Sequence, residues 1–136
     1  MIAVVDAGPL YAAVDASDDD HARSLEALER ADLQLVLPAL VVAEVTYIVG
    51  KRLGAQIESR FLRGLGELDI EQPAPEDWSR IADLVEEYSE FPLGGTDASV
   101  AVLAERLETD LLITLDRKHF GALKPRHCPV FRFLPE

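Results

Sequence analysis

Two kinds of apolar segment alternate along the chain and predict an α/β fold. Short apolar runs typical of buried strands occupy residues 2–5, 33–38, 68–70, 111–115 and 130–132. Longer segments with apolar residues at helical spacing lie between them, at residues 8–14, 22–31, 39–53, 57–65, 75–85 and 96–108. Strands that alternate with helices form a mostly parallel sheet with helices on both faces. No repeat or linker interrupts the pattern, so we expect residues 1–136 to form one domain.

Four carboxylates break this apolar pattern. Asp6 and Asp116 directly follow the strand runs 2–5 and 111–115, and Asp97 opens a helix after a Gly-Gly turn. Glu44 lies inside the apolar helix 39–53, where its neighbours three and four positions away are all apolar. Ligands of parallel sheets bind beyond the carboxyl ends of the strands, so we expect the four acids to share one anionic pocket. Clustered carboxylates repel one another unless a cation neutralises them, and Mg²⁺ or Mn²⁺ suits oxygen ligands.

Each acid also has an ordinary structural explanation, and these alternatives stay open at this point. Asp6 could cap a helix, although Pro9 would then occupy a capping position without an N–H to donate. Asp97 could interact with a helix dipole, and Asp116 could cap the turn that follows it. Glu44 could be covered by a basic side chain. The metal hypothesis rests on the fold bringing all four to one edge of the sheet.

Composition narrows the possible partners and the compartment. The formal net charge of −12 argues against non-specific binding of polyanions. No apolar run is long enough to span a membrane, and the opening residues do not resemble a signal peptide. The single cysteine, Cys128, excludes an internal disulfide, so we expect a cytoplasmic protein. A basic run beside the acidic pocket is suited to a phosphate chain, or is simply a solvated surface: Arg117, Lys118, His119, Lys124, Arg126 and His127.

Four segments in order resemble the motifs of PIN-domain ribonucleases, specifically the toxins of VapBC-type toxin–antitoxin pairs. The resemblance covers essentially the whole chain. It is carried by Val4-Val5-Asp6-Ala7-Gly8-Pro9-Leu10, Pro38-Ala39-Leu40-Val41-Val42-Ala43-Glu44-Val45, Leu93-Gly94-Gly95-Thr96-Asp97-Ala98 and Leu112-Ile113-Thr114-Leu115-Asp116-Arg117-Lys118-His119-Phe120. All four acids are present, with Asp97 in the loosest of the four segments.

The resemblance implies a three-layer α/β/α sandwich and Mg²⁺- or Mn²⁺-dependent endoribonuclease activity. It also implies a homodimer and inhibition by a cognate VapB-type antitoxin in a hetero-oligomer. Asp6, Asp97 and Asp116 would then hold the cation, and Glu44 would bind a second ion or orient the attacking water. Thr114 would hydrogen-bond a carboxylate or a phosphate, and Arg117 and Lys118 would contact RNA.

Three further expectations concern partners and alternatives. Helix 39–53 is apolar around nearly its whole circumference, which also favours a second copy of the chain as partner. Leu10 and Tyr11 either line a groove for the antitoxin or pack in the core. The competing functions are a PIN fold that binds protein or processes RNA without a toxin role, and a receiver-like signalling domain. The latter fits poorly, because it needs a phosphoacceptor Asp after a central strand near mid-chain.

Overall fold

The computed structural model describes residues 1–136 and contains five strands and seven helices. The strands are β1 (Ile2–Val5), β2 (Gln34–Pro38), β3 (Asp69–Glu71), β4 (Leu111–Ile113) and β5 (Arg132–Leu134). The helices are α1 (Ala7–Val14), α2 (His21–Leu28), α3 (Ala39–Leu53), α4 (Ala55–Leu65), α5 (Asp77–Glu87), α6 (Gly95–Arg106) and α7 (Arg117–Ala122). No helix has the length and apolar character needed to cross a membrane.

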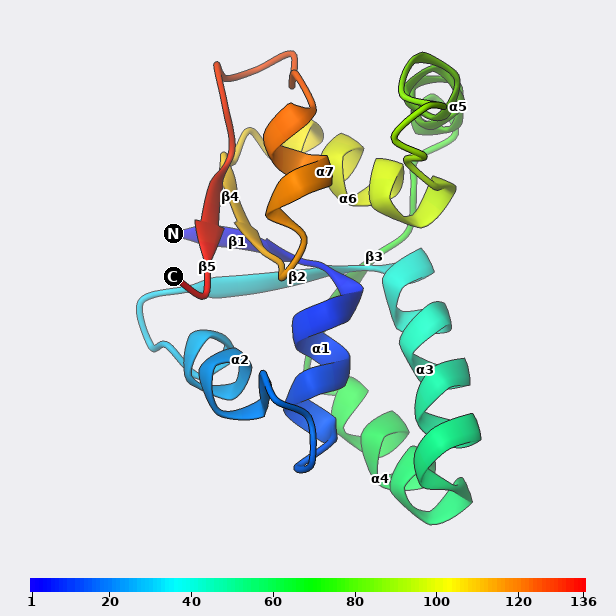
Figure 1. The fold of residues 1–136 in the computed structure, drawn as a ribbon, viewed down its shortest axis with the longest axis vertical. Helices are drawn as coiled ribbons and strands as arrows, with labels where there is room; N and C mark the ends of the chain where they lie inside the picture. The colour runs from blue at the N-terminus through cyan, green and yellow to red at the C-terminus, as the bar shows by residue number, and fades with distance from the viewer.

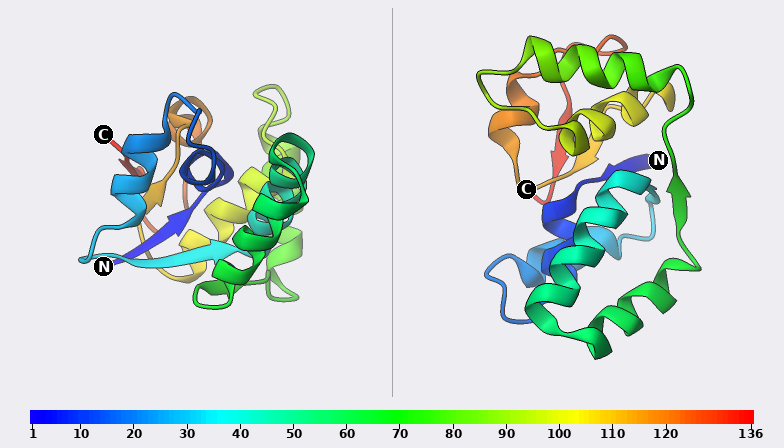
Figure 2. Two further views of the ribbon diagram at one scale, coloured as in Figure 1. Left: turned by 90° about the horizontal axis from the view of Figure 1, so that it is seen from below. Right: turned by 90° about the vertical axis from the view of Figure 1, so that its right-hand side faces the viewer.

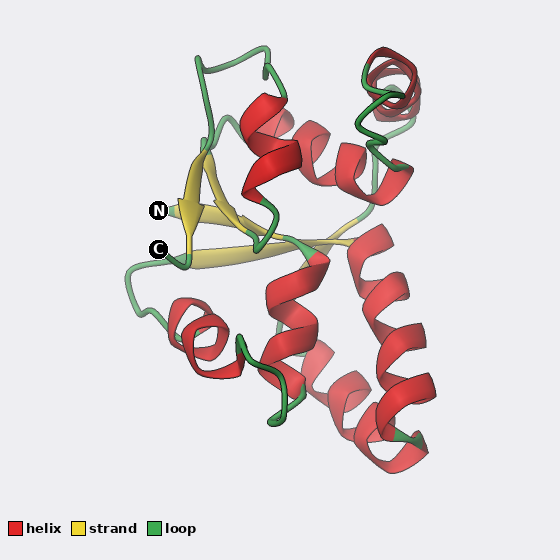
Figure 3. Cartoon of the chain, viewed as in Figure 1, coloured by secondary structure: helices red, strands yellow, loops and turns green.

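The five strands form one sheet in the order β3-β2-β1-β4-β5, and every neighbouring pair is parallel. β1 is central, with Val4 opposite Val36 of β2 on one side and Leu112 of β4 on the other. The strands lie between two groups of helices (Figures 1 and 3). The predicted α/β fold with a mostly parallel sheet is confirmed, and the sheet is parallel throughout.

Helices cover both faces of the sheet and make it the middle layer of three. Helices α1 to α4 lie on one side of the strands, and α5, α6 and α7 lie on the other (Figures 1 and 2). This division follows from the strand order, because right-handed crossovers change face when the direction of winding reverses. The chain winds from β1 outward to β3, returns to β4 on the other side of β1 and ends at β5.

The winding reverses between β1 and β4, and this position is where a doubly wound sheet opens a crevice for ligands. Asp6 follows β1 and Asp116 follows β4 by a short loop, so the topology brings both acids to the crevice. A receiver-like fold has the order 2-1-3-4-5, which differs from the order found here. The receiver alternative is therefore wrong.

Most of the all-round apolar surface of α3 is covered within the chain. Val41, Val45 and Val49 are fully buried on the face toward the core, and α1 and α4 pack beside them. Tyr47 remains 66% exposed on the opposite side. Glu44 is also exposed, contrary to the expectation that it points along a hydrophobic face. The reason is that α3 buries a narrow stripe at four-residue spacing, and Glu44 lies outside it.

Several predicted boundaries differ from the structure by a few residues, and two of these differences have a clear cause. The last strand begins at Arg132 rather than at Val130, because the N–H of Arg132 donates to the carbonyl of Asp110 at the start of the ladder with β4. Val130 is 63% exposed and lies before the strand. Helix α6 begins at Gly95, with Gly94 as its N-cap, so the predicted Gly-Gly loop is partly helical.

Candidate active site

Asp6 follows β1 and Thr114 follows β4, and hydrogen bonds connect these two strand ends at the crevice. The backbone N–H of Asp6 donates to the carbonyl of Ile113 at 2.9 Å, which continues the pairing of β1 with β4 by one residue. This contact places the hydroxyl of Thr114 so that it donates to Oδ2 of Asp6 at 2.7 Å. The same hydroxyl accepts the backbone N–H of Asp116 at 3.0 Å. Thr114 therefore links Asp6 to the loop that carries Asp116.

The carboxyl of Asp6 is buried and only partly satisfied. The residue is 5% exposed, and its Oδ1 has no hydrogen-bond partner. Burial raises the pKa of Asp6 to about 6, against the opposing effect of the hydrogen bond from Thr114. The charges of Asp97 and Asp116 raise this pKa further. Asp6 caps α1 by position, yet its side chain makes no capping hydrogen bond. The helix-cap explanation for this acid therefore fails.

Asp97 and Glu44 contribute to the same negative field. Asp97 is the third residue of α6, and burial followed by the charges of Asp116 and Glu44 raises its pKa. Glu44 is an exposed residue, but partial burial of its carboxyl and then the charge of Asp6 raise its pKa. The three carboxyls and Asp116 thus come from four separate segments and act on one another electrostatically. Carboxyls whose pKa values are raised by burial and by the charges of neighbouring carboxyls are typical of a functional site.

Asp116 is held by His119, a residue to which the sequence analysis assigned no role in the site. Oδ1 of Asp116 accepts the backbone N–H of His119 at 3.0 Å, and Oδ2 lies 2.7 Å from the ring Nδ1. The other ring nitrogen, Nε2, lies 2.7 Å from the carbonyl oxygen of Phe91. Both ring nitrogens face acceptors, which favours the doubly protonated imidazolium, and these two contacts raise the pKa of His119.

One feature of the sequence could have predicted the contact of His119 with Asp116. His119 follows Asp116 by three residues, and a side chain three positions after a helix N-cap lies close to the cap residue. Its contact with Phe91 joins residues 28 positions apart and has no signature in the sequence. Asp116 does cap α7, as the ordinary explanation proposed, while its charge still acts on Asp6 and Asp97.

The basic residues predicted to contact RNA differ in their surroundings. The guanidinium of Arg117 donates from Nη2 to the carbonyl of Pro135 at 2.6 Å and lies over the ring of Phe133. It is therefore bound to the C-terminal strand segment. Lys118 is exposed and has no hydrogen-bond partner or ion pair in the structure.

The oxygen donors at this end of the sheet suit Mg²⁺ or Mn²⁺ better than a softer metal. No group of three or more His, Cys, Asp and Glu side chains is placed so that it could hold a metal ion. Mg²⁺ does not require such a cage, because it keeps several waters and is often bound through one or two carboxylates. The unpartnered, buried Oδ1 of Asp6 is an oxygen of this kind. Three neighbouring acids supply the surrounding negative charge.

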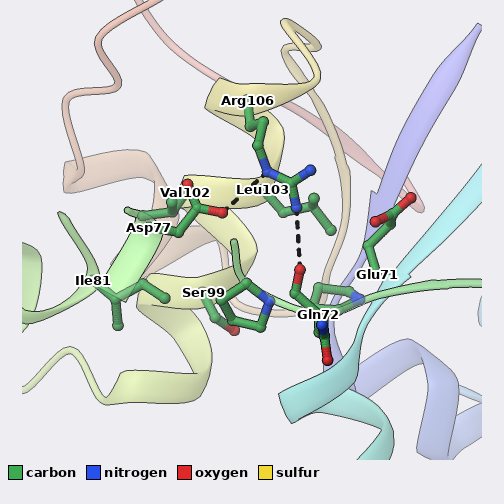
Figure 4. A pocket seen from close by; sticks show the side chains of 10 residues that line it. Glu71, Gln72, Asp77, Ile81, Ser99, Val102, Leu103 and Arg106 are labelled. Carbon is green, nitrogen blue, oxygen red and sulfur yellow. Dashed lines mark hydrogen bonds and ion pairs between the residues drawn. The ribbon is translucent and has the colours of Figure 1, made fainter. Parts of the chain in front are cut away.

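A small hollow of the molecule lies away from the acids and is structural. It is formed where the chain leaves β3 and meets α5 and α6 (Figure 4). Nε of Arg106 donates to Oδ2 of Asp77 at 3.0 Å, and Nη2 donates to the carbonyl of Gln72 at 3.2 Å. The volume is about 10 Å³, which is room for about one water. These satisfied contacts hold α5 against α6 and offer no site for a substrate.

Leu10 and Tyr11 pack in the core and do not line a groove. They are 7% and 8% exposed, and both belong to the main hydrophobic cluster. The hydroxyl of Tyr11 donates to Asp15 at 2.5 Å, and the guanidinium of Arg52 lies over its ring. Of the two roles considered for this pair, the structure supports core packing.

Comparison with known proteins identifies the family. The sequence model of the PIN domain family matches residues 3–124 of the chain. The chain belongs to the PIN domain family. This PIN domain is 36% identical to Ribonuclease VapC26 of Mycobacterium tuberculosis over 134 residues, which cover 97% of the chain and 99% of the relative. It is therefore a homologue of VapC ribonucleases.

Solved structures share the fold of this PIN domain over nearly its whole length. The sarcin-ricin-loop-cleaving toxin VapC20 of Mycobacterium tuberculosis superposes with a TM-score of 0.80 at 14% identity, covering 97% of this chain and 100% of the toxin. VapBC2 of Rickettsia felis, solved with a DNA fragment from its promoter, gives a TM-score of 0.71 at 20% identity and 98% coverage of each chain. The predicted three-layer sandwich is confirmed by these likenesses.

Proposed function

We propose that this PIN domain is a VapC-type endoribonuclease that hydrolyses RNA phosphodiester bonds with Mg²⁺ or Mn²⁺. The observation that carries the proposal is the buried carboxyl of Asp6 at the crevice, with one unpartnered oxygen and a pKa raised to about 6. Such a group is unfavourable for stability and suits a cation that binds there. The relationship to Ribonuclease VapC26 supports RNA as the substrate.

The roles of the acids follow from their surroundings. Asp6 and Asp97 would hold the ion, and Asp116, already bound to His119, would contribute through water or at longer range. When bound, the ion makes a coordinated water more acidic and stabilises negative charge on the phosphate oxygens. Glu44 is exposed with a raised pKa, so it is suited to orient the attacking water and accept its proton.

The hydrogen bonds around the acids preorganise the site. Thr114 fixes the orientation of the Asp6 carboxylate and leaves Oδ1 free. His119 holds the Asp116 carboxylate, and this contact and the Phe91 carbonyl raise its pKa. Lys118 is free to contact the RNA backbone, and Arg117 can do so after leaving the Pro135 carbonyl. Fixed groups of this kind stabilise a transition state without reorganising during the reaction.

We further propose a cognate VapB-type antitoxin as the protein partner, and a cytoplasmic location for the pair. The acid cluster attracts a basic side chain by the same field that attracts a cation, and the net charge of −12 steers a basic peptide toward the protein. Solved relatives of the same fold include the toxin–antitoxin assembly VapBC2. A homodimer, and a hetero-oligomer with the antitoxin, complete the proposed assembly.

The direct test is cleavage of total bacterial RNA by the purified protein with Mg²⁺, Mn²⁺ or EDTA. We expect cleavage with either ion and none in EDTA. Cleavage should also be lost when the cognate antitoxin, which we expect a neighbouring short reading frame to encode, is added. An antitoxin that binds without reducing cleavage would contradict inhibition by a basic side chain placed among the acids. RNA that stays intact with both ions would contradict the nuclease assignment itself.

A further inference from the structure

An exposed aromatic side chain lies beside the acid cluster and has no role in the core. Phe91 is 41% exposed and follows α5 in the loop that leads to Asp97. Its ring lies 6.1 Å from the ring of His119 in an edge-on arrangement, and His119 binds Asp116. The ring of Tyr88 lies 6.3 Å from that of Phe91. Phe91 is thus separated from an active-site carboxylate by one imidazole.

The loop is built to hold this ring in place. The carbonyl of Phe91 is bound by Nε2 of His119, and its N–H donates to the carbonyl of Tyr88 at 3.1 Å. The hydroxyl of Tyr88 accepts the backbone N–H of Lys124 at 3.0 Å. These contacts fix the backbone on both sides of an apolar ring that stays in solvent. An exposed ring on a fixed backbone loses little freedom when a flat ligand stacks on it.

An open hollow of about 470 Å³ lies on the surface next to the rings of Tyr88 and Phe91. Lys124 supplies a positive charge for a phosphate at its edge, whereas Glu87 and Glu90 on the same wall repel phosphate. The carboxylates accept hydrogen bonds from the amino groups of a base. The hollow therefore suits the base side of a nucleotide, with its phosphate turned toward Lys124.

We propose that an unpaired base of the RNA substrate, adjacent to the cleaved phosphate, stacks on Phe91 in this hollow. The proposal rests on the proposed ribonuclease function. A protein with a net charge of −12 gains little from attraction to the RNA backbone, so contacts to bases have to supply more of the affinity. Aromatic stacking supplies such affinity to single strands and requires an unpaired base.

The test measures binding without cleavage. Fluorescence anisotropy in EDTA compares a short labelled oligoadenylate with an abasic strand of the same length. We expect Phe91→Ala and Phe91→Leu to weaken oligoadenylate binding roughly 5- to 100-fold, and Phe91→Trp to keep it within about twofold. The leucine variant retains apolar packing, so it reports on stacking if the alanine variant folds poorly. Neither variant should change binding of the abasic strand.

Trp78→Ala is the matched control, because Trp78 is an exposed aromatic residue at the opposite end of α5, with 51% exposure. It should bind both strands as the wild type does. The stacking proposal would be overturned if the Phe91 variants lost affinity equally for both strands, or if neither variant lost affinity for oligoadenylate. If a Phe91 variant loses antitoxin binding but keeps RNA binding, this surface binds the protein partner, and the stacking proposal is overturned as well. If the wild type neither binds nor cleaves RNA, the proposed function fails instead.

Discussion

Thr114 donates its hydroxyl hydrogen to Asp6 across 108 positions of sequence, and the 2.7 Å contact connects β4 to β1 at the crevice. The receiving carboxylate is buried and has no other side-chain partner. This hydrogen bond helps to orient Asp6 and, of the contacts that limit the rise of its pKa, it has the largest effect, ahead of the backbone of Ala7. The same hydroxyl accepts the N–H of Asp116, so a change at Thr114 affects two of the acids at once.

Thr114→Val keeps the shape of the side chain and removes both hydrogen bonds of the hydroxyl, of which the one to the Asp6 carboxylate involves a charged group. We expect the free energy of unfolding at pH 7 to fall by about 1.5–3 kcal/mol, the typical contribution of a hydrogen bond to a charged group. Thr114→Ser retains the hydroxyl and should lose much less. Urea unfolding of both variants in EDTA measures the difference. Equal stability of the valine and serine variants would show that the contact contributes nothing.

Asp6 should make the stability of the metal-free protein depend on pH. Its pKa is about 6 in the folded state and 3.8 for the ordinary side chain, so the folded state holds the proton more tightly between these values. The stability contribution of Asp6 is thus present below about pH 4 and is lost as pH rises through 6. The shift of roughly two pKa units corresponds to about 3 kcal/mol.

Asp6→Asn removes this titration and isolates the effect. We expect the free energy of unfolding of the variant to rise, relative to that of the wild type, by about 3 kcal/mol from pH 4 to pH 7, because only the wild type loses stability over this range. Denaturant unfolding in EDTA at several pH values provides the comparison. A difference between the two proteins that does not change with pH would contradict the raised pKa of Asp6.

Mg²⁺ and Mn²⁺ should stabilise the folded protein, because an ion that binds only the folded state raises the melting temperature. At an ion concentration 100 times the Kd, the gain in unfolding free energy is about 2.7 kcal/mol. The gain should be smaller in Asp97→Asn. It should also be smaller in the wild type below pH 6, because protons then compete with the ion for the carboxylate of Asp6. Differential scanning fluorimetry measures these shifts. An equal shift in Asp97→Asn would exclude Asp97 from the site.

A homodimer in solution is a further prediction. Apolar side chains remain exposed on α3, α4 and the edge strand β3, where they would join a second copy: Tyr47, Leu62 and Ile70. An edge strand with exposed apolar residues is a common site of association. Light scattering at tens of micromolar should give twice the mass of one chain. A monomer mass under these conditions would contradict the prediction.

The sequence predicted the features that depend on local pattern. The strands before Asp6 and Asp116 were evident because short apolar runs end directly at an acid, and parallel strands then bring such acids together. The exposure of Glu44 was not evident, because it depends on which stripe of α3 faces the sheet. The contact between His119 and Phe91 depends on how helix α7 meets the distant loop between α5 and α6, which local pattern does not encode. The metal-binding roles of the four acids stay a prediction.

The activity of Asp6→Asn, compared with Asp19→Asn, tests the nuclease site most directly. Both changes remove one negative charge, but Asp6 is buried at the crevice and Asp19 is exposed in the loop before α2. With Mg²⁺ or Mn²⁺ and total RNA as substrate, we expect Asp6→Asn to lose at least about a hundredfold in cleavage rate and Asp19→Asn to match the wild type. Circular dichroism should show that both variants fold. A folded Asp6→Asn protein that cleaves RNA at the wild-type rate would contradict the assignment of this crevice as the active site.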